Sequence, residues 1–225
     1  MFDGRWRQSF EAGLKPVGAN LRRTGITADH LTVTGVLMAA AAAVAIANGA
    51  LRAGLLLLAL CALPDLLDGA VAKASGTDGP RGAFFDSVSD RVTDALLLGG
   101  VAWHLSTTHT GRIAVLPLAV LGASMLISYE RAKAESLGFD ARGGLMERAE
   151  RIIALGVGLL FDSILIGVLW VMLALTLATA VQRFAKVWQQ ASAATSVPQA
   201  SRWKARRAAR PTERVWRRRQ RTSRR

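Results

Sequence analysis

Four aspartates at short, regular spacings are the residues of this sequence best suited to chemistry. Asp65 and Asp68 are three positions apart, and Asp86 and Asp90 are four apart. On helices these spacings place each pair on one face, and the Gly- and Pro-containing link 76–80 lets the two helices pack antiparallel. Four converging carboxylates repel one another strongly unless cations neutralise them. We therefore predict a magnesium or manganese site, because these cations prefer hard oxygen ligands.

Small residues surround the aspartates and leave room for a ligand. Gly69 and Ala72 follow the first pair directly, and Gly82 precedes the second pair. Small side chains allow a helix or a nucleotide to approach closely. An alternative reading, in which the aspartates only cap helices at the membrane interface, does not explain why two acidic faces match. Asp94 extends the second face by one turn, and we expect a structural role for it.

Long uncharged runs show what positions these acids. The runs 31–51, 113–127 and 163–181 each approach the roughly 20 residues that a bilayer-crossing helix requires. We predict an all-α integral membrane protein with six transmembrane helices. The expected segments are about Leu31–Asn48, Ala53 into the first aspartates, Ala83–His104, Arg112–Glu135, Glu147–Phe161 and Ser163–Trp188.

Charge divides the chain into three parts. Residues 1–30 mix aromatic, aliphatic and basic side chains, which predicts a juxtamembrane amphipathic helix at the interface. Residues 31–188 form the six-helix domain. Residues 189–225 carry most of the formal net charge of +13 without apolar periodicity, so we predict a disordered basic cytoplasmic tail. Its expected partner is anionic membrane lipid, and no folded motif indicates nucleic-acid binding.

Basic residues orient the predicted bundle. Lys and Arg gather at one set of helix ends, including Arg23, Arg81, Arg131 and Arg148, whereas the opposite ends carry little besides Arg52 and Arg112. The positive-inside rule then places both termini and these ends in the cytoplasm, in a multi-pass protein of the cell membrane. Segments two to five are each charged in their cytoplasmic half only. Ionisable residues inside a membrane face a cavity or a partner, so we predict one polar chamber open to the cytoplasm.

The aspartates lie within a longer pattern that resembles a known family signature. Residues 65–90 read Asp-x2-Asp-Gly-x2-Ala-Lys-x8-Gly-x3-Asp-x3-Asp. This resembles the signature of the CDP-alcohol phosphotransferases, in which Arg usually occupies the position of Lys73. Lysine keeps the charge but loses bidentate phosphate contact. The resemblance implies an enzyme that takes a CDP-alcohol and displaces CMP with an acceptor hydroxyl.

The resemblance also implies roles for individual residues. Two Mg²⁺ ions would be held, one by Asp65, Asp68 and Asp86 and the other by Asp65, Asp86 and Asp90, with Asp90 also acting as general base. A homodimer is expected on the same ground. CDP-diacylglycerol would contact Asp29, His30, Leu31, Thr32, Gly69 and Lys73. Asp29 and Thr32 fit equally well a plain helix start, because N-cap residues cluster there.

A second group of charged residues is suited to binding another phosphate. Arg148 and Arg151 are three apart on one helical face, and Arg131 and Arg183 belong to neighbouring segments. Positive-inside anchoring is the alternative, and we favour it for Lys133 and Arg142. The runs 128–135 and 143–151 are similar to those of actinobacterial phosphatidylinositol-phosphate synthases. This similarity implies that inositol phosphate binds Ser128, Arg131, Arg148, Arg151 and Arg183.

Three other functions compete with transfer of a phosphatidyl group to inositol phosphate. The first keeps the chemistry but uses glycerol 3-phosphate as acceptor, as in a phosphatidylglycerophosphate synthase. The second is a magnesium transporter, although the carboxylates gather at one membrane end and not at the midplane, where carriers bind their substrates. The third is a lipid-binding scaffold that acts through the basic tail.

Overall fold

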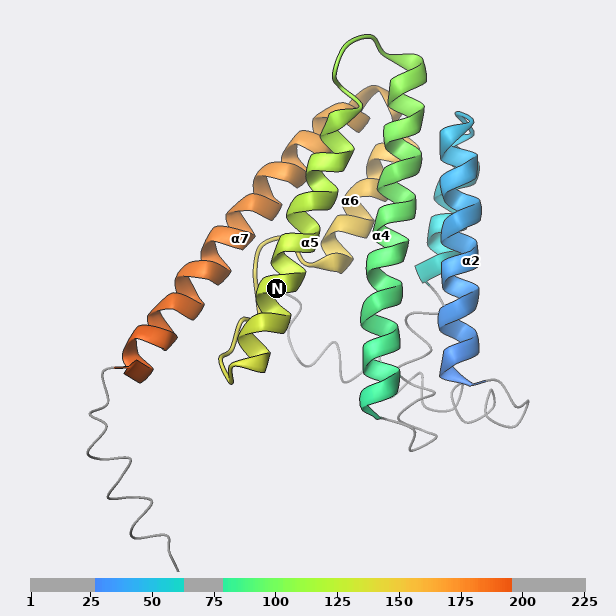
Figure 1. Cartoon of the computed structure of the whole chain (residues 1–225). Coiled ribbons are helices and arrows are strands. Elements are labelled where there is room, and N and C mark those ends of the chain that lie inside the picture. The colour runs from blue at the N-terminus through green and yellow to red at the C-terminus, as the bar shows by residue number, and fades with distance from the viewer. Residues whose placement is uncertain (1–26, 63–78, 196–225) are drawn as a thin grey trace, which may run out of the picture.

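A computed structural model describes residues 27–62 and 79–195 of the 225-residue chain. Every regular element in these ranges is helical, which confirms the all-α prediction there (Figure 1). The elements are α2 (Ala28–Ala47), a helix over Leu51–Ala62, α4 (Pro80–Thr108), α5 (Val115–Ser136), α6 (Arg148–Leu160), the 3₁₀ turn η1 (Asp162–Ile164) and α7 (Leu165–Thr195).

Some predictions fall on residues outside the described ranges. These include the amphipathic helix expected within residues 1–30 and the basic tail after residue 195. The same holds for four site residues, namely Asp65, Asp68, Gly69 and Lys73. Each of the six expected apolar segments nevertheless contains a helix in the part that is described.

Three of the described helices are long and apolar enough to cross a membrane. They span Asp29–Ala47, Val115–Ser136 and Asp162–Ala193. α6 has 13 residues and is therefore roughly 20 Å long, less than the ~30 Å hydrocarbon core. The full set of six crossings stays a prediction. Exposed apolar side chains on the outer faces suit a lipid environment: Leu37, Leu56 and Val181 are each at least 65% exposed.

Local sequence explains where several helices begin and end. Thr27 caps α2: its side chain accepts a hydrogen bond from the His30 backbone N–H, and the His30 ring accepts one from the Thr27 backbone. α2 ends before Asn48 and Gly49, and Gly49 has φ +80°, a conformation that glycine adopts without strain. α4 starts with Pro80 at its first position, where proline's missing N–H costs nothing.

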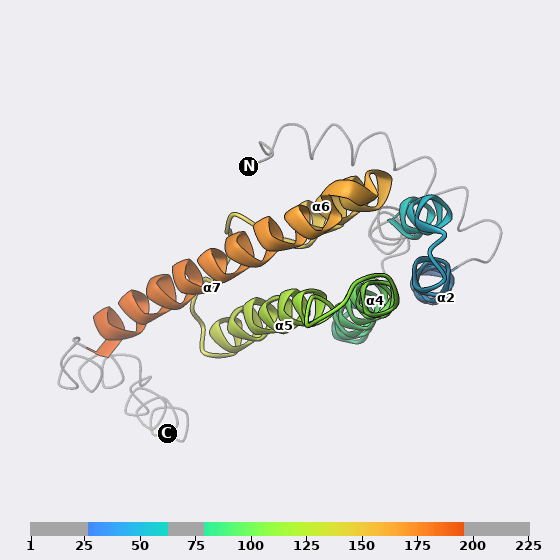
Figure 2. The same cartoon turned by 90° about the horizontal axis from the view of Figure 1, so that it is seen from above.

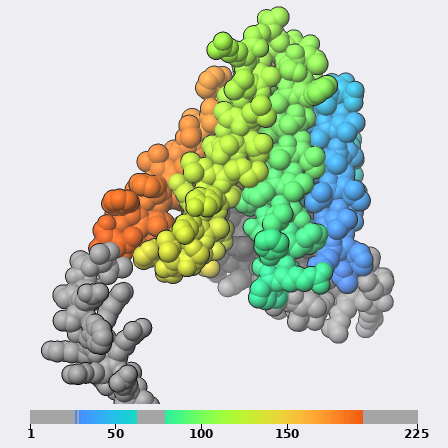
Figure 3. Space-filling model, viewed as in Figure 1, coloured from blue at the N-terminus to red at the C-terminus, as the bar shows by residue number. Residues whose placement is uncertain are grey.

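The helices stand side by side in the molecule (Figures 1 and 3). The N-terminal ends of α2, α4 and α6 and the C-terminal ends of α5 and α7 point toward the lower side of Figure 1. α4 packs against α2 and α5, and α7 packs against α5 and α6. Seen from above, α7 extends beyond the other helices at its C-terminal end (Figure 2). The charged ends of α4, α5 and α6 therefore share one region.

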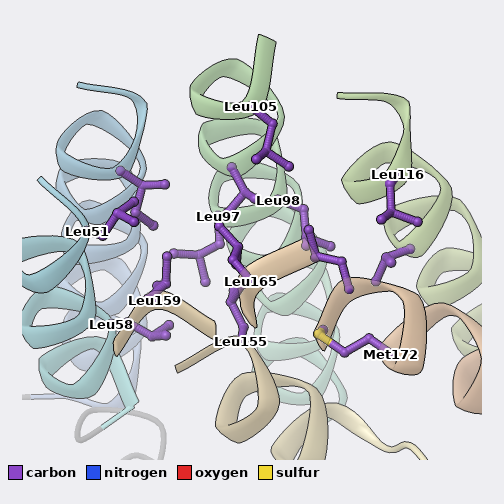
Figure 4. Close-up of a cluster of buried hydrophobic side chains, with 14 of the residues drawn as sticks. Leu51, Leu58, Leu97, Leu98, Leu105, Leu116, Leu155, Leu159, Leu165 and Met172 are labelled. Carbon is purple, nitrogen blue, oxygen red and sulfur yellow. The ribbon is translucent and has the colours of Figure 1, made fainter. Parts of the chain in front are cut away.

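The core fills the opposite half of the bundle. Leu97 and Leu105 of α4, Leu159 of α6 and Leu165 and Met172 of α7 are almost fully buried and belong to one apolar cluster (Figure 4). At Gly100 the backbones of α4 and α2 come very close, since a Cβ there would lie 2.6 Å from the Ala43 carbonyl oxygen. This packing fixes how α4 is rotated and which of its side chains face α6.

Candidate active site

Three acids line one face of α4 near its N-terminal end. Asp86, Asp90 and Asp94 follow one another at intervals of four residues, about one turn each. Asp86 is exposed, Asp90 is half-buried and Asp94 is buried. The face therefore runs from the surface into the bundle. The two outer acids, Asp86 and Asp90, are two of the four predicted metal ligands, and they lie in the described part of the chain.

The two arginines of α6 meet this acidic face. Arg148 Nη1 lies 2.7 Å from Asp90 Oδ1, and Arg148 Nε lies 3.8 Å from Asp94 Oδ1. One turn further, Arg151 Nη2 donates to Asp94 Oδ2 at 2.8 Å. Arg91 of α4 also contacts Asp90, at 3.4 Å. Two carboxylates of α4 thus face two guanidinium groups of α6. This places Arg148, one of the predicted acceptor residues, directly beside the predicted base Asp90.

Arg183 of α7 is buried behind this cluster and is surrounded by protein acceptors. Its guanidinium donates to the Ile127 carbonyl at 2.9 Å, the Gly143 carbonyl at 3.0 Å and Glu147 Oε1 at 3.1 Å. Glu147 precedes Arg148 directly and occupies the N-cap of α6. Arg131 and Arg151 lie within electrostatic range of Arg183. The structure therefore shows Arg183 joining α5, the 137–147 loop and α6, while contact with an acceptor phosphate stays a prediction.

One face of α7 holds the loop that leads into α6. Besides Arg183, the hydroxyl of Thr179 accepts hydrogen bonds from the backbone N–H groups of Leu145 and Met146, at 3.1 and 3.0 Å. Gly144 presses so closely on Thr179 that a Cβ at Gly144 would clash with it. The remaining residues of this α7 face are Lys186 and Gln190, and both contact Asp140.

Asp140 is the charged anchor at the outer end of this loop. Lys186 Nζ donates to Asp140 Oδ2 at 2.8 Å, and the backbone N–H of Arg142 donates to Asp140 Oδ1 at 3.0 Å. The hydrogen bond from Lys186, followed by that from Arg142, holds the pKa of Asp140 below its ordinary value. Because Asp140 lies at the surface, solvent screens this ion pair.

Ser128 and Arg131 of α5 lie differently from the other predicted acceptor residues. The exposed Arg131 side chain pairs with Glu135 of its own helix at 3.0 Å. Ser128 donates to the Ser124 carbonyl and lines a groove of about 500 Å³ between α4 and α5, together with Ser87, Arg91 and several apolar residues.

The predicted nucleotide-binding residues of α2 lie at its first turn. Asp29 Oδ2 pairs with Arg81 Nη2 of α4 at 2.9 Å, which ties the beginnings of the two helices together. Thr32 is buried, Leu31 is half-buried, and His30 completes the capping box with Thr27. The helix-start reading is therefore confirmed for this segment, with Thr27 as the N-cap. A nucleotide contact by the same residues stays a prediction.

The described part of the chain contains only half of the proposed metal ligands. In residues 27–62 and 79–195, no three His, Cys, Asp or Glu side chains come together as a metal site would require. Asp86 and Asp90 supply the hard oxygen donors that Mg²⁺ and Mn²⁺ prefer, one turn apart on α4. The donor chemistry therefore fits the predicted cations, provided that Asp65 and Asp68 complete the set.

Sequence reasoning missed some residues that shape this site. Asp94 was assigned only a structural role, although its i+4 spacing from Asp90 continues the acidic face. Glu147 and Thr179 were not predicted at all. The periodic spacing of Thr179, Arg183, Lys186 and Gln190 on one helical face was a usable signal for α7. No pattern in the sequence pointed to the irregular loop that this face contacts.

Comparisons with known proteins agree with this geometry. Residues 25–182 match the CDP-alcohol phosphatidyltransferase family. An archaetidylinositol phosphate synthase of Methanothermobacter thermautotrophicus is 37% identical over 174 residues, covering 75% of this chain and 86% of that protein. A phosphatidylinositol phosphate synthase of Mycobacteroides abscessus is 34% identical over 185 residues, covering 79% and 84%.

Solved structures give the same result. The crystal structure of Mycobacterium tuberculosis phosphatidylinositol phosphate synthase with CDP-DAG bound has 31% sequence identity and a TM-score of 0.71, and the match covers 78% of this chain and 93% of that one. The same enzyme in complex with manganese and citrate has a TM-score of 0.72, with 78% of this chain and 88% of that chain covered. Fold and sequence therefore point to one family.

Proposed function

The chain belongs to the CDP-alcohol phosphatidyltransferase family and is an enzyme of that family, and from this premise we propose that its acceptor is inositol phosphate. The donor in this proposal is CDP-diacylglycerol, and the products are phosphatidylinositol phosphate and CMP. The relatives differ in the lipid part of their names, archaetidyl or phosphatidyl, but share inositol phosphate. Membership in a transferase family also favours this function over a magnesium transporter.

The observation that carries the proposal is the contact of Arg148 with Asp90. Guanidinium groups bind phosphate oxygens through charge-assisted hydrogen bonds. Arg148 is 21% exposed in its side chain and lies 2.7 Å from Asp90. An acceptor whose phosphate binds Arg148 therefore has its hydroxyl groups within a few ångströms of a carboxylate able to take up a proton. An unphosphorylated acceptor would leave this arginine without its ligand.

The reaction forms one bond and breaks one bond. A hydroxyl oxygen of inositol phosphate attacks the phosphorus that carries the diacylglycerol, and the bond from this phosphorus to the CMP oxygen breaks. Asp90 takes the hydroxyl proton, and CMP leaves with the bonding electron pair. The guanidinium of Arg148, 2.7 Å from Asp90 Oδ1, would hold this carboxylate in place beside the acceptor.

The same proposal assigns the remaining residues. Asp65, Asp68, Asp86 and Asp90 would hold two Mg²⁺ or Mn²⁺ ions, and a solved structure of a relative is in complex with manganese. When bound, these ions would neutralise the pyrophosphate and the charge that develops on the leaving CMP. The CDP group would contact Asp29, His30, Leu31, Thr32, Gly69 and Lys73. The acceptor would bind Ser128, Arg131, Arg148, Arg151 and Arg183.

The proposal also includes a cellular setting. The protein would be a homodimer crossing the cell membrane six times, with the active site and both termini in the cytoplasm and the basic tail on anionic lipid. The shared direction of the charged ends of α4, α5 and α6 supports one polar chamber on one side of the bundle (Figure 1). Three helices suited to span a bilayer support the membrane location.

An acceptor competition tests the proposed function. Purified protein in detergent receives CDP-diacylglycerol and Mg²⁺ with inositol phosphate, glycerol 3-phosphate or unphosphorylated inositol at equal concentrations. CMP release is measured, and the lipid product is identified by mass spectrometry. We expect the highest kcat/KM with inositol phosphate. An equal or higher kcat/KM with glycerol 3-phosphate would overturn this choice of acceptor, and CMP release that needs no acceptor would overturn the transferase assignment.

A further inference from the structure

Asp94 is the only acid buried in the described part of the chain, which makes its surroundings informative. The buried charged residues there are Asp94, Arg151 and Arg183. A buried carboxylate is strongly unfavourable unless it is paired and hydrogen-bonded. Asp94 meets this requirement through α6, since its two oxygens face two different arginines of that helix. The sequence and the comparisons assign it no part in the reaction.

The geometry separates the two arginines by depth. Arg151 donates to Asp94 at 2.8 Å, and both side chains are less than 10% exposed. Arg148 lies one turn nearer the surface, with its Nε 3.8 Å from the other Asp94 oxygen and its side chain 21% exposed. Asp94 therefore holds the guanidinium of Arg151 and borders that of Arg148, whose Nη1 contacts Asp90. A single buried carboxylate organises both.

We propose that Asp94 is a positioning residue for a phosphomonoester acceptor, holding Arg148 and Arg151 in the orientation in which they bind its phosphate. This inference rests on the proposed function and extends it to a residue outside the family signature. In this proposal two acids of α4 have different roles. Asp90 takes the proton of the acceptor hydroxyl, and Asp94, one turn deeper, orients the arginines that bind the acceptor phosphate. Without the Asp94 charge, Arg148 would lose the carboxylate beside its Nε and turn toward Asp90.

The variant Asp94→Asn tests the orientation directly. Its amide oxygen can still accept from Arg151, but its NH₂ group then faces Arg148 Nε, so that donor meets donor and Arg148 is displaced. The substitution also adds one net positive charge, which by itself would strengthen phosphate binding. We expect the loss of alignment to outweigh this gain, because bidentate binding of phosphate requires aligned guanidinium groups. We expect the KM for inositol phosphate to rise about tenfold, as loss of one charge-assisted hydrogen bond would produce. The KM for CDP-diacylglycerol should change less than twofold.

A selectivity ratio distinguishes positioning from a purely structural role. The ratio compares kcat/KM for inositol phosphate with kcat/KM for unphosphorylated inositol. Displaced arginines lower this ratio, whereas a loosened fold lowers both values together. The thermal stabilisation of the protein by inositol phosphate without CDP-diacylglycerol gives a second measure, and we expect Asp94→Asn to lose most of it. Asp94→Glu keeps the charge and should lie between the two proteins on both measures.

Matched controls and outcomes complete the test. Asp162→Asn makes the same chemical change at an exposed acid of η1 and should leave every value unchanged. An unchanged selectivity ratio in folded Asp94→Asn would overturn the inference. Should Asp94→Asn fail to fold, equal acceptor KM values for Asp94→Glu and the unmodified protein would overturn it as well. If the unmodified protein prefers glycerol 3-phosphate, the proposed acceptor is wrong, and the ratio of glycerol 3-phosphate to glycerol tests Asp94 in the same way.

Discussion

The two halves of α4 are held in the bundle by different interactions. From Leu97 to Leu105 the helix packs by apolar contact, with Gly100 against the α2 backbone. Near its N-terminal end, Asp90 and Asp94 meet the arginines of α6 through ion pairs. The apolar half has one well-packed arrangement, because interiors tolerate little change in shape. The polar half is able to exchange one ionic partner for another.

This contrast explains why chemistry belongs at one end of the helix. A phosphate or a cation competes with existing ion pairs for Arg148 or Asp90, and such exchanges require charged neighbours. The same exchange in the apolar half would strand an unpaired charge among leucines. The rigid half thus sets the rotation of α4, and the charged half uses that rotation to direct its acids at α6. The variants below separate the two contributions.

The largest effect is expected in the polar half, at Asp90. In Asp90→Asn the proton acceptor is lost, and kcat for CMP release should fall roughly 10²- to 10⁴-fold. Its thermal unfolding temperature should stay close to that of the unmodified protein, because the amide oxygen still faces Arg148. Activity is measured by CMP release and folding by thermal unfolding in detergent. Activity within tenfold of the unmodified enzyme would show that another group takes the proton.

The complementary change in the apolar half should affect stability and spare catalysis. Leu97 is 1% exposed, and Leu97→Ala leaves a cavity among the core leucines. Moving the removed side-chain atoms from the core into detergent costs little free energy, so the lost packing contacts dominate. We therefore expect a loss of about 2 kcal/mol in unfolding free energy. The kcat of the folded fraction should change less than twofold. Leu37→Ala, at a 65% exposed position of α2, is the control and should cost little.

Removing Arg148 should change the metal and acceptor requirements in opposite directions. Its guanidinium lies 2.7 Å from Asp90 and competes with any cation bound there. In Arg148→Gln we therefore expect the Mg²⁺ concentration for half-maximal activity to fall several-fold, while the KM for inositol phosphate rises about tenfold. Titrations of each component at saturating levels of the others measure both values. A rise in the Mg²⁺ requirement would contradict a competition between Arg148 and the cation.

The helices were predicted well from the sequence because long apolar runs indicate membrane-spanning helices. α6 was expected at Glu147–Phe161 and is found at Arg148–Leu160, whereas α2 was expected from about Leu31 and begins three residues earlier, at Ala28. The charge pattern also placed Arg148 near the aspartates. Both inferences depend on the spacing of residues within single segments, which can be read from the sequence alone.

Partners across helices were harder to predict. Asp94 faces Arg151 because Leu155 and Leu159 of α6 pack into the core and set the rotation of that helix. Arg183 was predicted as an acceptor ligand from its charge, but its depth depends on how α7 crosses α5. The path of the 137–147 loop, to which Arg183 donates at Gly143, has no periodicity from which it could be predicted.

A smaller effect is expected where α7 holds this loop. Thr179→Val removes the acceptor for the backbone N–H groups of Leu145 and Met146 and should cost about 1–3 kcal/mol in stability. Because the loop ends at Arg148, the KM for inositol phosphate should also rise a few-fold. Thr176→Val is the matched control, since the Thr176 hydroxyl bonds only to the Met172 carbonyl within its own helix in the described contacts. Equal effects of the two variants would show that Thr179 does not position the loop.

The smallest effect is expected at the outer end of the loop, where Asp140 meets Lys186. The pKa of Asp140 is lower in the folded than in the unfolded protein, so its ion pair stabilises the fold above the unfolded value of about 4. This contribution disappears as pH falls through the folded pKa. Asp140→Asn should therefore lower the unfolding temperature by at most about 2 °C at pH 7, because the pair is exposed and screened. At pH values below the folded pKa the two proteins should unfold at the same temperature, and a difference that persists or grows in acid would assign the effect to the Asp140 hydrogen bonds and not to its charge.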